Sequence, residues 1–94
     1  FYFISRRKTL DDAEFHRYWK EVHGPIVKRI GALKRYVQLH RVAFPGQNSP
    51  YDGAAEVWVE DEAALASIMH DPAYLDGALA DEPNFIDMSC TEWL

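Results

Sequence analysis

The hydrophobic pattern of this chain switches repeatedly between the two-residue period of a strand and the longer period of a helix. Residues 1–5 are aromatic and β-branched, which is typical of a strand. From Thr9, a suitable cap, to about His23, apolar residues recur at three- and four-residue spacing. Gly24-Pro25 predicts an interruption, because the residue before a proline disfavours helical geometry. A continuation over residues 25–30 is expected after it.

The second half of the chain repeats this order. Residues 33–43 predict a long strand, residues 44–53 a loop rich in Pro, Gly, Asn and Ser, and residues 54–60 a third strand. Asp61 and Glu62 open a second helix, an irregular helical stretch follows Pro72, and residues 84–93 predict the last strand. The order predicts one α+β domain over residues 1–94, a ferredoxin-like β-α-β-β-α-β sandwich with a four-stranded antiparallel sheet and both helices on one face.

Charge and composition exclude several classes of protein. The net charge of −5 argues against a nucleic-acid partner, since phosphates require clustered Lys and Arg. No apolar run approaches the roughly 20 residues that span a bilayer, so we expect no membrane partner. The single cysteine, Cys90, cannot form an internal disulfide, which favours a cytoplasmic location.

Strand alternation separates the side chains of the predicted sheet into two sets. The aliphatic set, with Val37 and Leu39, fits under the helices. The other set is too apolar for water and too polar for a dry core, which predicts a half-wet cavity enclosed by the sheets of a homodimer. Its members are Tyr36, Gln38, His40, Glu56, Trp58, Phe85, Asp87, Ser89 and Trp93.

His23 is the first candidate for chemistry. It ends a helix, its ordinary pKa lies near neutrality, and Gly24-Pro25 fixes the backbone after it, as suits a general acid or base. The alternative is a histidine that caps the last helical carbonyls or lies exposed.

Other polar residues of the same sheet face admit two interpretations. Tyr36, Gln38 and His40 could orient a carbonyl or hydroxyl, or form a polar stripe on a solvated sheet. Asp87 and Glu56 could act as a base, or only pair with arginines or backbone. Trp58 is expected in the wall of the cavity or in the dimer core.

No metal or cofactor motif is present in the sequence. His16 and His23 are two helical turns apart, and there is no H-E-x-x-H, cysteine pair, haem-attachment motif or phosphate-binding Gly-rich loop. We therefore expect no metal site and no cofactor.

Four segments of the chain resemble the EthD family: residues 14–19 (EFHRYW), 22–27 (VHGPIV), 35–38 (RYVQ) and 81–87 (DEPNFID). The resemblance implies a dimeric α+β barrel. Relatives of that barrel include methylmuconolactone methylisomerases, polyketide cyclases, decarboxylases or dehydratases of aromatic polyketides, and cofactor-free or haem-degrading monooxygenases. EthD proteins are linked to ether-degradation operons and often carry an oxidoreductase label.

The resemblance also implies roles for two residues. His23 and Tyr36 match the histidine and tyrosine that line the methylisomerase pocket. The further histidine and the cysteine of that enzyme have no counterpart here, which implies a shared pocket but not the isomerase reaction.

Three functions follow as hypotheses. The first is an enzyme acting by proton transfer on small aromatic, lactone or polyketide-like molecules, with His23 and Tyr36 as catalytic residues and with Asp87 or Glu56 tuning the histidine. The second is a binding or accessory protein, and the third a haem-handling barrel. The expected substrate-binding residues are Phe3, Trp19, Gln38, His40, Glu56, Trp58, Phe85 and Asp87.

Overall fold

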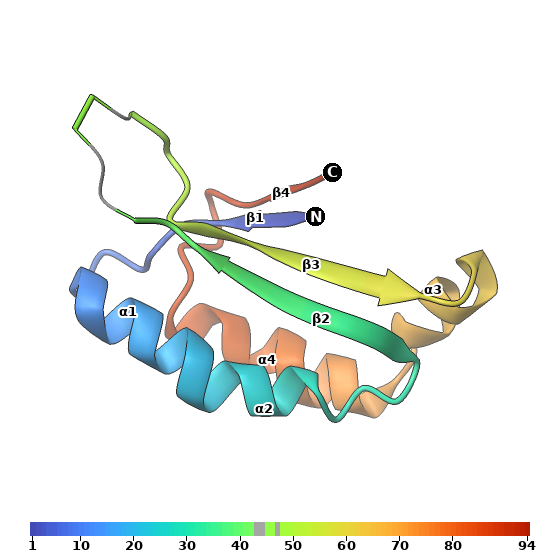
Figure 1. Ribbon diagram of the computed structural model, residues 1–94. Helices are drawn as coiled ribbons and strands as arrows, with labels where there is room; N and C mark the ends of the chain where they lie inside the picture. Colours follow the sequence, from blue (N-terminus) through green and yellow to red (C-terminus); the bar gives the residue numbers. More distant parts are fainter. Residues whose placement is uncertain (43–44, 47) are drawn as a thin grey trace.

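Four antiparallel strands form one sheet in the order β2-β3-β1-β4 in the computed structural model, which describes residues 1–42, 45–46 and 48–94. The strands are β1 (Tyr2–Ile4), β2 (Leu33–His40), β3 (Gly53–Val59) and β4 (Glu92–Trp93). The helical segments cover one face of this sheet, and the two termini lie side by side on β1 and β4 (Figure 1). The predicted α+β class and antiparallel sheet are confirmed.

The first helical segment is continuous, although its type changes twice. It consists of α1 (Asp12–Tyr18), the π-helix η1 (Trp19–His23) and α2 (Gly24–Val27). Gly24 keeps helical angles (φ −53°, ψ −50°), so the predicted interruption is wrong. Glycine has no Cβ to clash with the ring of Pro25, and the proline occupies the first turn of α2, where its missing N–H costs little.

Aspartates, rather than a threonine, start both helical segments. The Asp11 carboxylate accepts a hydrogen bond from the Glu14 backbone N–H over 2.8 Å, so α1 begins later than the predicted cap at Thr9. Asp61 caps α3 (Glu62–Ile68) in the same way through Ala64, as the sequence predicted. A π-helix η2 (Ala73–Ala78), a short α4 (Leu79–Asp81) and a 3-10 turn η3 (Glu82–Asn84) follow.

The last predicted strand, residues 84–93, is mostly irregular. Only Glu92 and Trp93 pair as β4, and Ile86 forms one isolated bridge to Arg6. Pro83 lies in η3, and the Asp87 carboxylate then accepts hydrogen bonds from the backbone N–H and the hydroxyl of Ser89. These local bonds replace the ladder of a strand. The predicted strand 33–43 ends at residue 40 in β2, and residues 43, 44 and 47 of the predicted strand and loop lie outside the described residues.

The predicted faces of β2 are reversed. Tyr36 pairs with Val57 and Gln38 with Ala55, and these residues face the helices. Val37 and Leu39 face away from them, and Leu39 is 46% exposed. The polarity of Tyr36 and Gln38 predicts a high cost of burial, but hydrogen bonds satisfy their polar atoms beneath the helices.

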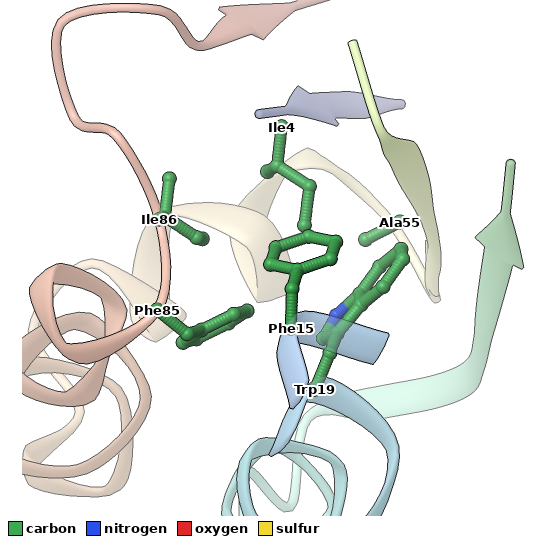
Figure 2. Packing of buried hydrophobic residues seen from close by; sticks show 6 residues of the cluster. All are labelled: Ile4, Phe15, Trp19, Ala55, Phe85 and Ile86. Carbon is green, nitrogen blue, oxygen red and sulfur yellow. The ribbon is translucent and has the colours of Figure 1, made fainter. Parts of the chain in front are cut away.

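An aromatic cluster joins the first helical segment to the sheet and to the turn after η3. Its buried members are Ile4, Phe15, Trp19, Ala55, Phe85 and Ile86 (Figure 2). Phe15 and Phe85 are fully buried, with ring centroids 5.8 Å apart. Beside them a second cluster of Val27, Ile30, Ile68 and Ala78 closes the far end of the helical layer. The candidate site lies between these two clusters and the sheet.

Candidate functional site

A cavity of about 80 Å³ lies between the helices and the sheet of this single chain. Its walls are mainly apolar, and its polar groups come from His23, Tyr36, Tyr2, Tyr74 and Glu82. The exposed side chains of Leu65, Met69 and Trp93 form its rim. The cavity is therefore on the helix side of the sheet, not between two sheets as the sequence argument expected. The remaining wall residues are Ile4, Trp19, Val27, Ile30, Leu33, Ala55, Val57, Ile68, Ala78 and Ile86.

His23 is held by a buried carboxylate. Its Nδ1 lies 2.8 Å from Oδ2 of Asp81, and both side chains are about nine-tenths buried. The other Asp81 oxygen, Oδ1, accepts hydrogen bonds from the Tyr18 hydroxyl at 2.6 Å and from Asn84 Nδ2 at 3.0 Å. The ring of His23 packs on Phe85 with centroids 4.7 Å apart. The histidine therefore has a single fixed orientation.

The protonation state of this pair follows from its surroundings. Burial lowers the pKa of His23, although the hydrogen bond and charge of Asp81 oppose this shift. Burial also opposes ionisation of Asp81, but hydrogen bonds from Tyr18, Asn84 and His23 outweigh it and hold its pKa below the ordinary value. At neutral pH Asp81 is therefore ionised and accepts from Nδ1–H of a neutral His23. The basic nitrogen left for the cavity is Nε2.

The neighbouring glycine allows His23 to reach this position. A Cβ on Gly24 would lie 3.2 Å from Gln38 Nε2, so a larger residue would require the Gln38 side chain to shift. The π-helix places Trp19 and His23 on the sheet side, where both are buried. The histidine, glycine and proline at 23–25 therefore lie in one continuous helical segment that is packed closely against β2.

Tyr36 lines the cavity, and a hydrogen bond from Gln38 fixes the position of its hydroxyl. Gln38 Nε2 donates to the Tyr36 hydroxyl over 2.9 Å and to the Trp19 carbonyl over 2.8 Å. Because the Tyr36 oxygen accepts this bond, its own O–H remains available to donate to a bound molecule. Burial raises the pKa of Tyr36, while hydrogen bonds from Gln38 and the Trp19 side chain oppose the rise. Tyr36 is therefore neutral at physiological pH.

Gln38 and His40 support Tyr36 from outside the cavity. His40 Nε2 lies 2.7 Å from Gln38 Oε1 and must donate to it, which fixes the orientation of the amide. His40 Nδ1 lies 2.7 Å from Nδ1 of His16 at the protein surface. Gln38 and His40, both predicted to bind substrate, are therefore not in the cavity wall. Gln38 instead positions Tyr36, which is.

The remaining predicted site residues lie elsewhere. Phe3, Glu56 and Trp58 are on the outer face of the sheet, where the Trp58 indole N–H donates to Glu56 Oε1. Phe85 packs in the core beneath His23, and Asp87 holds the turn to Ser89. Of the ten predicted residues, the cavity brings together His23, Tyr36 and Trp19.

Sequence reasoning missed the acidic pair Asp81-Glu82. It assigned the tuning of His23 to Asp87 or Glu56, yet the carboxylate in contact with His23 belongs to Asp81. The signal was present, because residues 81–87 form one of the segments that carry the family resemblance. What the pattern lacked was the change from α4 to η3, which sends the two neighbouring side chains to different partners.

Metal-ion sites and membrane-spanning helices also bear on function. Among residues 1–42, 45–46 and 48–94 no group of three or more His, Cys, Asp or Glu side chains is arranged to hold a metal ion. Within the same residues, no helix has the length and apolar character needed to cross a membrane.

Comparison with known proteins gives two similarities. The family model described as the EthD domain matches residues 7–89. Among solved structures, an ethyl tert-butyl ether D (EthD) family protein from Bacillus halodurans is similar, with a TM-score of 0.74 and 14% sequence identity. That match covers 99% of this chain and 93% of the other, and at this identity it shows the fold. A comparison with curated protein sequences finds no match.

Proposed function

The chain belongs to the EthD family, and we propose that it binds a small, uncharged aromatic or lactone-like molecule in the cavity and transfers a proton there. The observation that carries this proposal is the buried His23–Asp81 pair beside a mainly apolar cavity that Tyr36 also lines. A few convergent polar groups on apolar walls are typical of small-molecule sites.

In this proposal His23 is the general base. Asp81 holds Nδ1–H, so Nε2 removes a proton from a carbon next to the carbonyl group of the ligand. The Tyr36 hydroxyl donates to the carbonyl oxygen, where negative charge develops as the C–H bond breaks. His23 then returns the proton to the same or another carbon. Return to another carbon is an isomerisation, and no redox partner is needed.

The size of the cavity limits the ligand. One water molecule needs about 10–15 Å³ of such space, so about 80 Å³ corresponds to a single ring with small substituents. A haem does not fit without displacement of the walls, which disfavours the third sequence hypothesis. A carrier that binds the same molecules without converting them remains the alternative that the experiment must separate.

We also propose that the chain works as a homodimer that pairs through the outer face of the sheet. This face exposes Trp58 (52%) and Leu39 (46%) near the half-buried Phe3. Exposed apolar side chains gathered on one sheet face are typical of an interface. In sedimentation, Trp58→Glu should convert a dimer into monomers, and a monomeric wild type would contradict the pairing.

The proton-transfer proposal is tested by hydrogen exchange in D₂O. Cyclohexanone and a methyl-substituted butenolide serve as probes, and NMR follows the loss of the signals of hydrogens adjacent to the carbonyl. The wild type should accelerate this exchange, and His23→Asn should lower the rate by about 10²- to 10⁴-fold. His70→Asn, at an exposed position, is the matched control. Equal exchange rates for wild type and His23→Asn would contradict the assignment of His23 as the base. Binding of a probe without hydrogen exchange would favour a carrier that does not convert its ligand.

A further inference from the structure

Glu82 is a buried acid that the mechanism above does not use. It is the first residue of η3, only 6% exposed, and it lines the cavity. Its Oε2 atom is buried and has no hydrogen-bond partner among the described residues. Buried polar atoms are rarely left in this state, so an unpartnered carboxyl oxygen on a residue that lines a cavity points to a ligand group that pairs with it once the side chain turns.

The surroundings of Glu82 favour its neutral form. Burial raises the pKa of this carboxyl, a hydrogen bond from Tyr2 opposes the rise, and the charge of Asp81 adds to it. None of the ion pairs among the described residues involves Glu82. The protein therefore supplies no cation to stabilise the charged form, and ionisation in this position is costly.

Three tyrosines share the cavity with the Glu82 carboxyl. Burial is the main cause of the raised pKa of Tyr2, Tyr36 and Tyr74, and the nearby Glu82 charge raises the pKa of each further. All three tyrosines line the same cavity. Because each can donate or accept, this end of the cavity is suited to a group with both capacities.

We propose that Glu82 is a ligand-binding residue that recognises a hydroxyl group, and that the natural ligand is therefore a small hydroxylated ring rather than a plain hydrocarbon or an amine. A neutral carboxyl donates through its O–H and accepts through its carbonyl oxygen, and a hydroxyl group is complementary to both. An ammonium group would require two charges to be buried in an apolar space. This inference rests on the proposed small-molecule cavity and names its ligand class.

The test compares two probes of similar shape, phenol and toluene. Calorimetric or NMR titration measures the affinity of the full-length wild type and of Glu82→Met, which keeps the length of the side chain but loses its polar atoms. Phenol affinity should fall about tenfold in the variant, while toluene affinity stays the same or rises. Glu82→Gln, which can still donate and accept, should keep most of the phenol affinity. Glu56→Met on the outer sheet face should change neither.

A second readout does not depend on the stability of Glu82→Met. In the wild type, phenol should shift the infrared carbonyl band of a buried carboxyl, and this band should be missing in Glu82→Gln. An unshifted band, or equal phenol affinity in wild type and Glu82→Met while toluene binds, overturns the role of Glu82 and leaves the cavity as a binding site. Failure of every probe to bind overturns the cavity itself. Loss of phenol affinity in Glu82→Met together with unchanged hydrogen exchange in His23→Asn supports Glu82 and refutes only proton transfer.

Discussion

His23 Nδ1 and Asp81 Oδ2 lie 2.8 Å apart although 58 residues separate them in the chain. This contact joins the π-helix after α1 to the end of α4, and it fixes which nitrogen of His23 faces the cavity. Because Asp81 is also bound by Tyr18 and Asn84, the pair is part of a network and not a surface ion pair. Asp81→Asn tests this network directly.

Asp81→Asn should leave the His23 ring in place but no longer fix which of its nitrogens carries the hydrogen. The amide of asparagine can accept from Nδ1–H, but it can also present its NH₂ group and select the other tautomer. We expect the hydrogen-exchange rate to fall by about 100-fold or more, with probe binding changed much less. Asp76→Asn, an exposed acid in η2, is the control. If Asp81→Asn exchanges the probe hydrogens at the wild-type rate, the network stabilises the structure but does not contribute to the reaction.

Two histidines with lowered pKa values, the buried His23 and the partly exposed His40, should make stability depend on pH. Burial is the first cause of the lowered pKa of His23 and of His40, and for His40 the charges of His16 and Lys20 add to it. The unfolded chain then binds more protons than the folded one below pH 6.5. This stabilising contribution is complete above pH 6.5 and is lost as the pH falls through the folded pKa values.

Urea unfolding at several pH values between 5 and 8 measures this effect. His40→Asn should lose less stability on acidification than the wild type, because one of the two groups no longer titrates. His70→Asn should retain the wild-type slope. The same slope in wild type and His40→Asn would mean that the His16–His40 contact contributes nothing to the pH dependence.

Glu82 should contribute a pH dependence of stability opposite to that of the histidines, and Glu82→Gln should remove it. The pKa of the Glu82 carboxyl is raised, so its stabilising contribution is complete below pH 4.5 and is lost as the pH rises through the folded pKa. The amide has no such loss. We therefore expect Glu82→Gln to be more stable than the wild type by about 1–3 kcal/mol at pH 8, and to have no advantage at pH 4. Chemical unfolding at both pH values measures this difference in the free energy of unfolding. A gain in stability that is the same at pH 4 and pH 8 would contradict a raised pKa of Glu82 as its cause.

Gly53→Ala should destabilise the fold where β3 meets Trp19. A Cβ there would lie 2.4 Å from Trp19 Cζ3 and 2.7 Å from the Leu39 carbonyl oxygen. Relief of these contacts requires the indole and the strand to move, at a cost of about 1–3 kcal/mol. Gly31→Ala is the matched control, since a Cβ there meets no atom within 4 Å. Equal unfolding midpoints for the two variants would show that the Trp19 packing is loose.

Local signals in the sequence predicted the fold well but misplaced the site. The helical stripe from Phe15 to Ile30 and the β-branched runs are short-range patterns, so the order of elements and the sheet could be predicted. The face of β2 could not, because polar residues among aromatic ones indicate the lining of a half-wet cavity on the side away from the helices. Gln38 is polar and still lies beneath the helices, because the Trp19 carbonyl accepts its hydrogen bond, and this contact depends on tertiary structure.

The roles of the acidic residues show the same limit. Asp87 alternated suitably in a predicted strand, but its side chain closes a turn with Ser89. Asp81 and Glu82 are neighbours with the same charge, and nothing local indicates that one carboxylate binds His23 while the other faces a cavity. By contrast, His23 and Tyr36 were selected by motif, and both line the cavity.

The most direct test of the central claim is ¹⁵N NMR of His23 during titration with cyclohexanone. We predict a neutral ring with hydrogen on Nδ1 at pH 7, and an Nε2 signal that moves as the probe enters the cavity. A ring protonated on Nε2, or an Nε2 signal that stays in place while the probe binds, would contradict the assignment of this nitrogen as the base.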